Sequence, residues 1–188
     1  MGKLVVTEFI SLDGVIEDPG GAEQYRHGGW TFKFNQGEGG PYKGAELRAA
    51  DAQLLGRVTY EAFAKAWPTM EGTGEFGEKM NAMPKFVVST TLENPEWNNS
   101  TVLRGGDGLA EEVNALKQQF DGDILVAGSA RLAQSLLAND LVDELHLMVF
   151  PIVLGGGKRL FADGDEATTL SLVDTKQTGD VVILTYRR

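Results

Sequence analysis

The sequence contains no cysteine, and it has no apolar run near the roughly 20 residues that a membrane-spanning helix needs. Without cysteine the chain has neither disulfides nor a thiolate nucleophile, which fits a reducing compartment. It also opens without the charged and apolar segments of a secretory signal. We therefore expect a cytoplasmic protein with no membrane partner.

Histidine and positive charge are also scarce. The two histidines, His27 and His146, lie far apart in the sequence and form no pattern typical of a zinc site, so we expect no metal. Lysine and arginine number 17 against 27 aspartate and glutamate residues, which gives a formal net charge of −10. Such a charge repels nucleic acid, so we expect no nucleic-acid partner. Any phosphate ligand must be held by local arginines and backbone N–H groups.

Strand and helix patterns alternate along the 188 residues, of which 42% are hydrophobic, enough for the core of a single domain over residues 1–188. Strands are expected over residues 3–10, 53–55, 85–89, 101–103, 123–126 and 144–150, and helices over residues 45–52, 58–66, 75–82, 107–120 and 129–137. Asp107 is expected to cap the fourth of these helices. Residues 170–177 and 181–186 flank Thr178-Gly179-Asp180 as a hairpin. This order predicts an α/β fold, a three-layer αβα sandwich with a mostly parallel mixed sheet and a C-terminal antiparallel hairpin.

Two glycine turns between a strand and a helix carry the strongest functional signal. Residues 54–61 run from an apolar strand end through Gly56 into a helix, and residues 124–131 repeat this pattern through Gly128. Glycine lets the backbone bend without a Cβ clash, and the helix points free N–H groups and its positive dipole end at whatever lies there. Two such turns suit the separated phosphates of a dinucleotide. The alternative is that Gly128 marks a routine strand-to-helix turn.

Five motifs follow one another over nearly the whole chain: Phe9-Ile10-Ser11-Leu12-Asp13-Gly14-Val15-Ile16, Leu55-Gly56-Arg57-Val58-Thr59-Tyr60-Glu61, Phe86-Val87-Val88-Ser89-Thr90, Val126-Ala127-Gly128-Ser129, and Pro151-Ile152-Val153-Leu154-Gly155-Gly156-Gly157 with Leu160-Phe161 after it. Together they resemble the dihydrofolate reductase-like family, most closely the C-terminal reductase domain of the bifunctional riboflavin-biosynthesis deaminase/reductase. The resemblance implies a dihydrofolate reductase-like fold with NADPH as cofactor.

In that family the glycine-arginine turn and the hydroxyl residues at the end of the next strand flank the adenosine-side phosphates of NADPH, and the later glycine turn holds the pyrophosphate. Carried over by motif, the resemblance implies that the cofactor contacts Gly14, Ile16, Gly56, Arg57, Val58, Thr59, Ser89, Thr90, Ala127, Gly128, Ser129, Ala130 and Arg131.

The residue types at the first of these turns agree with that assignment. Arg57 offers a planar cation for a ribose 2′-phosphate, and Ser89 and Thr90 add hydroxyl donors. We therefore expect NADPH to be preferred over NADH. The alternative is that Arg57 is an ordinary solvated side chain at the start of a helix.

The chain departs from the family pattern at two places. The family's later turn often has two consecutive glycines, joined in dihydrofolate reductase by a cis peptide, whereas this chain has Ala127-Gly128, so the turn is expected to differ in detail. Dihydrofolate reductase also has an acidic residue on its first helix that anchors the pterin. The helix around Glu46 and Asp51 offers no clear equivalent, so the resemblance does not extend to a folate substrate.

Asp13, with Ser11 beside it, is the candidate catalytic residue, because hydride transfer usually needs a proton donor as well. An aspartate at a strand end near Phe9 and Val15 is expected to have its pKa raised by desolvation and to act as an acid or as a substrate anchor, oriented by Ser11. The alternative is that Asp13 serves only the turn, because Asp-Gly is a strong turn dipeptide.

Residues 11–40 form a long glycine-rich segment, which we expect to be a mobile lid over the substrate. Its aromatic residues are candidates for the walls of a flat substrate site, and the alternative for each is ordinary packing: Tyr25, Trp30, Phe32 and Phe34.

Two functions remain open from the sequence. The first is an NADPH-dependent reductase that transfers a hydride to a small planar heterocycle, pterin-like or pyrimidine-like. The second is an NADP(H)-binding protein without turnover, because fold resemblance does not by itself determine chemistry. An antiparallel sheet edge and apolar strands such as residues 146–150 also favour a homodimer.

Overall fold

The computed structural model describes residues 1–164 and 167–188, and its eight strands form one sheet in the order β4-β3-β2-β5-β1-β6-β8-β7. The strands are β1 (Leu4–Ser11), β2 (Ala50–Gly56), β3 (Lys85–Val88), β4 (Ser100–Leu103), β5 (Asp123–Val126), β6 (Glu144–Phe150), β7 (Ser171–Thr178) and β8 (Val181–Arg187). Strands β1 to β6 pair in parallel, and β8 is antiparallel to both β6 and β7.

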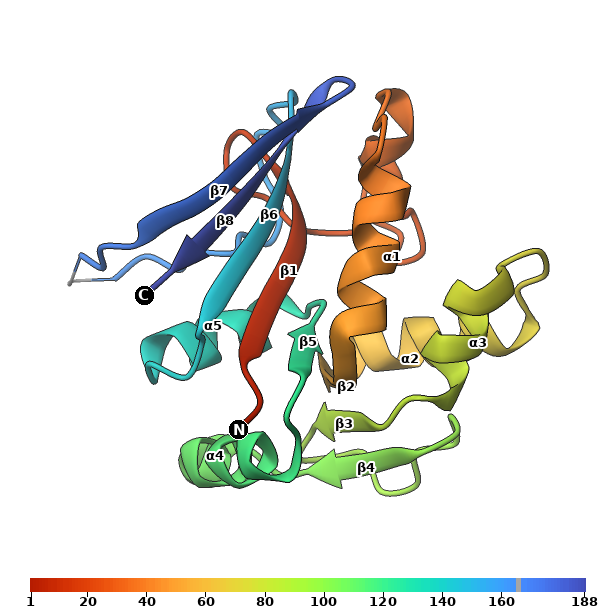
Figure 1. Ribbon diagram of the computed structural model, residues 1–188, viewed down its shortest axis with the longest axis vertical. Helices are drawn as coiled ribbons and strands as arrows, with labels where there is room; N and C mark the ends of the chain where they lie inside the picture. The colour runs from red at the N-terminus through yellow and green to blue at the C-terminus, as the bar shows by residue number, and fades with distance from the viewer. Residues whose placement is uncertain (165–166) are drawn as a thin grey trace.

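Helices cover both faces of this sheet (Figure 1). The helices are α1 (Gly39–Ala49), α2 (Arg57–Ala66), α3 (Gly74–Ala82), α4 (Leu109–Gln119) and α5 (Ala130–Ala138), and 3₁₀ turns span Trp30–Lys33, Trp67–Thr69 and Gly106–Gly108. Residues of α4 and α5 pack with Leu4, Val6 and other residues of one face, while residues of α1, α2 and α3 pack with Val5 and Leu55 of the opposite face. The predicted three-layer αβα sandwich with a C-terminal antiparallel hairpin is confirmed.

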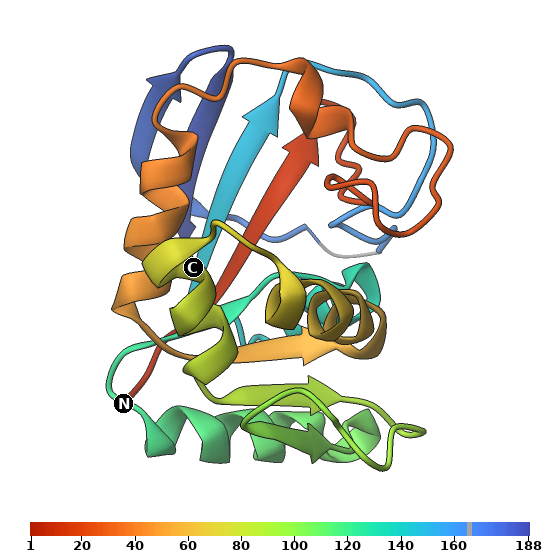
Figure 2. The same ribbon diagram turned by 90° about the vertical axis from the view of Figure 1, so that its right-hand side faces the viewer.

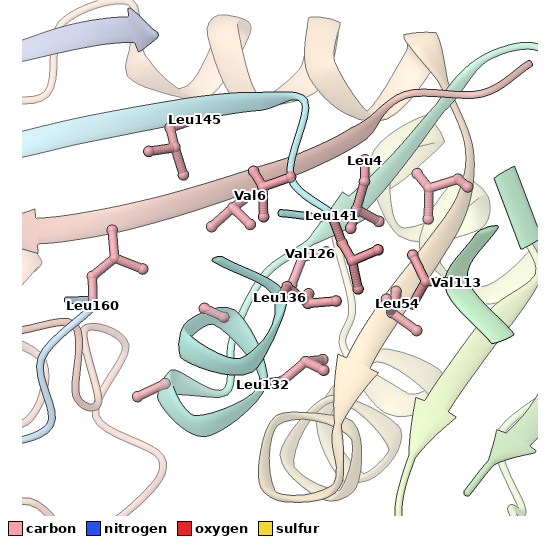
Figure 3. Close-up of a cluster of buried hydrophobic side chains, with 14 of the residues drawn as sticks. Leu4, Val6, Leu54, Val113, Val126, Leu132, Leu136, Leu141, Leu145 and Leu160 are labelled. Atoms are coloured by element: carbon pink, nitrogen blue, oxygen red, sulfur yellow. The ribbon is translucent and has the colours of Figure 1, made fainter. Parts of the chain in front are cut away.

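The larger core lies between the sheet and the α4–α5 layer. Figure 3 shows it as an unbroken set of branched aliphatic side chains, including Leu4, Leu54, Val126 and Leu136. All four are completely buried. Because parallel strands lie under helices on both faces, their sequences read as continuous apolar runs, and this is why periodicity located β1, β5 and β6 closely.

Two element boundaries differ from the prediction for tertiary reasons. Helix α1 begins at Gly39 and ends at Ala49, where β2 takes over, so the helix predicted over residues 45–52 is wrong at both ends. Glycine near the start of α1 disguises the helix, but a Cβ at Gly39 would collide with the side chain of Met148 on β6. The predicted cap at Asp107 is also wrong, because Asp107 lies within a 3₁₀ turn and Gly108 precedes α4 without a side-chain cap.

The strand named above as favouring a homodimer, which contains residues 146–150, is not at an edge of the sheet. It is β6, which lies between β1 and β8, and the edges of the sheet are β4 and β7. Strand β7 is exposed along nearly its whole length, with Leu172 54% and Val173 45% exposed. The homodimer stays a prediction, and of the two features that favoured it only the antiparallel edge at β7 is at the surface of the sheet.

The segment over residues 11–40 is packed rather than loose. Trp30 is completely buried, its ring lies 5.3 Å from that of Phe150, and its Nε1 donates a hydrogen bond to the Glu17 carbonyl at 2.9 Å. The Asp18 carboxylate accepts hydrogen bonds from the Glu23 and Tyr25 N–H groups. In Figure 2 this segment lies side by side with the stretch that follows β6.

The aromatic residues around Trp30 belong to a core of their own, whereas the mobility of the segment and its response to a ligand stay predictions. Tyr25 and Phe34 pack against this core from the margin, while Phe32 is 75% exposed. Packing, and not a wall of a substrate site, is the role that the structure assigns to Tyr25, Trp30 and Phe34.

No helix within the two described ranges has the length and apolar character to span a bilayer.

Trp30 and Phe32 provide a matched test of this packing. Trp30→Ala is expected to lower the free energy of unfolding by about 3–5 kcal/mol, because it removes a completely buried aromatic side chain. Phe32→Ala, two residues away, should change it by less than about 0.5 kcal/mol. Urea denaturation measures both. Equal losses for the two variants would show that the segment does not pack as described.

Candidate functional site

The two glycine turns predicted separately from the sequence touch each other in the structure. Strand β5 is the sheet neighbour of β2, so the turns that follow these two parallel strands emerge at the same edge. The Gly56 N–H donates a hydrogen bond to the Gly128 carbonyl at 3.3 Å. Ligands of open α/β sheets collect at this carboxyl-terminal edge.

Both glycines are required by this contact. A Cβ at Gly56 would clash with the Ser129 hydroxyl. Gly128 has a φ of +85°, which side-chain-bearing residues rarely adopt, and a Cβ there would come within 2.7 Å of the Thr59 Oγ1 atom. The peptide bond between Gly128 and Ser129 is cis. The cis bond is therefore the one that follows Gly128, and not the bond between Ala127 and Gly128 that corresponds to the paired glycines of the family pattern.

Two helices begin at this contact without a side-chain cap. Gly56 precedes α2, Ser129 precedes α5, and neither makes a side-chain hydrogen bond to the first turn of its helix. Free N–H groups and the positive dipole ends of both helices therefore meet where the turns meet. This arrangement fits a ligand with two neighbouring anionic groups, such as the pyrophosphate of a dinucleotide.

Arg57 lies at the start of α2 and is half exposed. Its Nη1 donates to the Thr91 Oγ1 at 2.6 Å, and its Nε lies 3.3 Å from the Glu61 Oε1. The guanidinium is therefore held beside the end of β3 rather than fully solvated. Thr91, which the motif comparison passed over, is the hydroxyl residue that contacts Arg57.

The two predicted hydroxyl residues have different surroundings. Ser89 is buried, and its Oγ accepts hydrogen bonds from the N–H groups of Thr91 and Leu92, so it shapes the loop after β3. Thr90 is exposed. Arg104, at the end of β4, reaches the carbonyl of Leu92 at 3.1 Å and adds a second cation to this corner of the sheet edge. No sequence motif marked Arg104, because its position depends on β3 and β4 pairing.

The remaining predicted cofactor residues divide between core and surface. Ala130 and Thr59 are 7% exposed, whereas Arg131 in the first turn of α5 is exposed. Val58 is 46% exposed. Ala127 packs at the margin of the core that faces α2. Of the predicted cofactor residues, Arg57 and Arg131 therefore present cationic side chains at this edge, together with backbone groups.

Asp13 ties the turn after β1 to the stretch after β6. Its Oδ1 accepts hydrogen bonds from the Ser11 Oγ at 2.6 Å and the Leu154 N–H at 3.0 Å, and its Oδ2 accepts one from the Gly155 N–H at 2.8 Å. The Ser11 hydroxyl and these two N–H groups outweigh desolvation and lower the pKa of Asp13 to about 2. The expectation of a raised pKa is therefore wrong, and Asp13 is not an acid at neutral pH.

Ser11, Gly14 and Ile16 complete the same turn. Ser11 also accepts a hydrogen bond from the Val15 N–H at 2.9 Å through its Oγ. Gly14 has a φ of +82°, and its carbonyl accepts a hydrogen bond from the Leu160 N–H. Ile16 is 6% exposed and belongs to the main core together with Ala130 of α5. The structure thus shows Ser11 and Asp13 holding this turn against residues 154 and 155, while a contact of Asp13 with a substrate stays a prediction.

A buried polar network lies beneath α1. The Glu46 carboxylate accepts hydrogen bonds from the Thr7 Oγ1 at 2.9 and 3.0 Å and from the Lys43 Nζ at 3.0 Å, and it lies 2.7 Å from the His146 Nδ1. Burial raises the pKa of Glu46, but Lys43 and His146 outweigh it and hold that pKa below its usual value. Burial likewise lowers the pKa of His146, and its contacts with Glu46 and Glu144 outweigh this and raise it. Glu46 is therefore fully engaged within the protein.

The described residues form a pocket away from the two turns and no group of metal-ligating side chains. A surface hollow of about 840 Å³ lies between α2 and the segment after β3, and its lining includes Tyr60, Glu61 and Trp97 but no glycine of either turn. Within residues 1–164 and 167–188, no set of three or more His, Cys, Asp or Glu side chains is arranged to hold a metal ion.

Comparison with known proteins identifies the family. A model of the RibD C-terminal domain matches residues 2–184. The chain belongs to this family. Protein YwjB of Bacillus subtilis (strain 168) is 30% identical over 186 residues, which cover 99% of this chain and 98% of YwjB. Protein YyaP of the same strain is 28% identical over 188 residues, which cover 96% of this chain and 92% of YyaP.

Solved structures agree on the fold of this RibD C-terminal domain. A putative riboflavin biosynthesis protein from Shewanella sp. PV-4 superposes with a TM-score of 0.76 at 22% identity, covering 99% of this chain and 98% of that one. RibD of Acinetobacter baumannii has a TM-score of 0.66 at 19% identity, and this chain spans 58% of its length. Dihydrofolate reductase from Enterococcus faecalis, complexed with NADP(H), has a TM-score of 0.57 at 16% identity, covering 100% of this chain and 96% of that one. The resemblance drawn from the five motifs is confirmed.

Asp13→Asn tests the positioning role of the first turn. The amide keeps the shape of the carboxylate but cannot accept all three hydrogen bonds, so the free energy of unfolding at pH 7 should fall by about 1–3 kcal/mol. Because folding lowers the pKa of Asp13, its contribution is present above pH 4 and is lost as pH falls toward about 2. The difference between the two proteins should therefore shrink over that range in urea titrations. Asp121→Asn, at an exposed aspartate, is the control and should change stability by less than about 0.5 kcal/mol.

Proposed function

We propose that this RibD C-terminal domain is an NADPH-dependent reductase that transfers a hydride to a small planar heterocycle of pterin or pyrimidine type. The observation that carries the proposal is the meeting of two uncapped helix N-termini at the hydrogen bond between Gly56 and Gly128. Family membership supports a reductase, and the fold is shared with a dihydrofolate reductase that binds NADP(H).

The residues of this edge fit the anionic half of such a cofactor. Backbone N–H groups at the starts of α2 and α5, after Gly56 and Ser129, would hold the pyrophosphate. Arg57, steadied by Thr91, would pair with the 2′-phosphate, a planar cation being suited to two phosphate oxygens at once. When bound, NADPH supplies the hydride. The protein contributes binding, orientation and exclusion of water.

The first turn contributes position rather than a proton. Asp13 and Ser11 hold residues 154 and 155 against the end of β1, which closes one side of the sheet edge. Glu46 is saturated by Thr7, Lys43 and His146, so it is not free to anchor a pterin as an acidic residue does in dihydrofolate reductase. We therefore propose a heterocycle other than folate.

The alternative, an NADP(H)-binding protein without turnover, is favoured by the low pKa of Asp13, which removes the proton donor expected in the first turn. Consumption of NADPH distinguishes the two. A reductase should oxidise NADPH, followed by the loss of its absorbance, in the presence of a member of a panel of oxidised pterins and pyrimidines. A binding protein should bind NADPH tightly and oxidise it with none of them.

Cofactor preference tests the proposed role of Arg57. Fluorescence titration should show that NADPH binds at least several-fold more tightly than NADH. Arg57→Ala should remove charge-assisted hydrogen bonds that contribute about 1.5–3 kcal/mol and so erase most of that preference, with little effect on NADH. Arg48→Ala, at an exposed cation on α1, is the matched control and should keep the preference. Equal affinity for the two nucleotides in the parent protein would refute the assignment of Arg57.

A further inference from the structure

A buried carboxyl group on β1 lies beside the Gly128 turn, and one of its oxygens lacks a hydrogen-bond partner in the described residues. Glu8 is 7% exposed, and within the described chain its Oε1 has no partner. Side chains alternate along a strand, so Glu8 shares the face of Val6 and Ile10, which belong to the core that α5 covers. The Gly128 N–H lies near enough to the Glu8 carboxyl to oppose the rise of its pKa. Glu8 therefore approaches the turn from within the sheet.

The surroundings of Glu8 favour its neutral form. Burial raises the pKa of Glu8 to about 8, the attraction of Lys43 on α1 and the Gly128 N–H oppose that rise, and the repulsion of Glu23 in the segment after β1 adds to it. Lys43 is already engaged by Thr7 and Glu46. At neutral pH the group is thus mainly a carboxylic acid, with one O–H to donate and one oxygen available to the Gly128 N–H.

The sheet opens at the level of Glu8. Strand β1 pairs with β5 over Leu4–Val6 only, whereas its pairing with β6 continues as far as Ser11. Among the described residues, no strand therefore pairs with β1 on the β5 side beyond Val6. Glu8 lies two residues beyond the last residue of β1 that pairs with β5, with the Gly128 turn beside it.

We propose that Glu8 is a cofactor-binding residue, and that its O–H donates a hydrogen bond to the carboxamide oxygen of the nicotinamide. The proposal rests on the function proposed above. An uncharged amide is the part of a dinucleotide that suits a buried site without a free cation, whereas the phosphates suit the helix N-termini and Arg57. An unpaired buried donor is costly, and an acceptor on the ligand removes that cost.

A proton is then coupled to cofactor binding. Only the protonated acid donates to the amide, so the cofactor draws Glu8 into its protonated form and binding takes up a proton near pH 8. Affinity should fall by up to about tenfold for each pH unit above 8. The 2′-phosphate of NADPH titrates near pH 6, so uptake at pH 8 should be the same with NADPH and NADH.

Isothermal titration calorimetry with NADPH and with NADH at pH 8, in phosphate and in Tris, measures this uptake directly. The parent protein should take up roughly half a proton per cofactor. Glu8→Gln keeps an N–H donor and should bind with similar affinity at pH 7, but with no proton uptake and no fall in affinity above pH 8. Glu8→Leu, which has no donor, should bind both nucleotides about tenfold more weakly at pH 7. Glu23→Gln is the matched control and should retain the uptake.

The outcomes separate the two levels of the proposal. A parent protein that binds neither nucleotide overturns the proposed function. Binding without proton uptake, or with the same uptake in Glu8→Gln, overturns the role of Glu8 alone. Uptake that disappears in Glu23→Gln but persists in Glu8→Gln assigns the proton to Glu23 and also overturns it. Circular dichroism and urea denaturation confirm that each variant is folded before it is titrated.

Discussion

The contact between the Gly56 turn and the Gly128 turn is the constraint on which the rest of the site depends. It requires β5 to insert between β2 and β1, so that two turns more than seventy residues apart reach one sheet edge, with glycine in both. Any side chain at either position would push α2 and α5 apart. With the turns in contact, the two uncapped helix starts act on the same small volume, and a phosphate there receives both sets of N–H groups.

Charge within this acidic protein is arranged locally. The net charge of −10 would repel a nucleotide, yet the sheet edge offers Arg57, Arg104 and the helix N-termini. Beneath α1 a buried negative charge needs compensation. Lys43 and His146 pair with the Glu46 carboxylate and supply it. Glu8 lies close by on β1 without such neutralisation, and burial keeps it protonated. The pKa of one buried acid is thus lowered and that of the other raised, because only Glu46 has cations bonded to it.

The turn after β1 and the long segment that follows it are held together by hydrogen bonds and by packing. Asp13 accepts two backbone N–H groups from the stretch after β6, and Trp30 fills a separate core against Phe150. These contacts bind two segments that are distant in sequence into one wall of the sheet edge. Family resemblance draws attention to the motif around Asp13, but hydrogen-bond geometry decides whether a carboxyl group serves as an acid. Here three donors stabilise its charged form.

The layered α/β fold, the family and both glycine turns could be predicted from local sequence patterns, because buried parallel strands and strand-glycine-helix turns leave such patterns. These patterns missed the start of α1, where the glycine at position 39 is explained by Met148 on β6, a residue more than one hundred positions away. The contact between Gly56 and Gly128, the lowered pKa of Asp13 and the raised pKa of Glu8 follow from the folded structure. Each of these depends on groups brought together by strand order: hydrogen bonds between turns, N–H groups around a carboxylate, and the exclusion of water from a carboxyl group. A linear pattern records which residues are present, but pKa and contact follow from the neighbours that folding supplies.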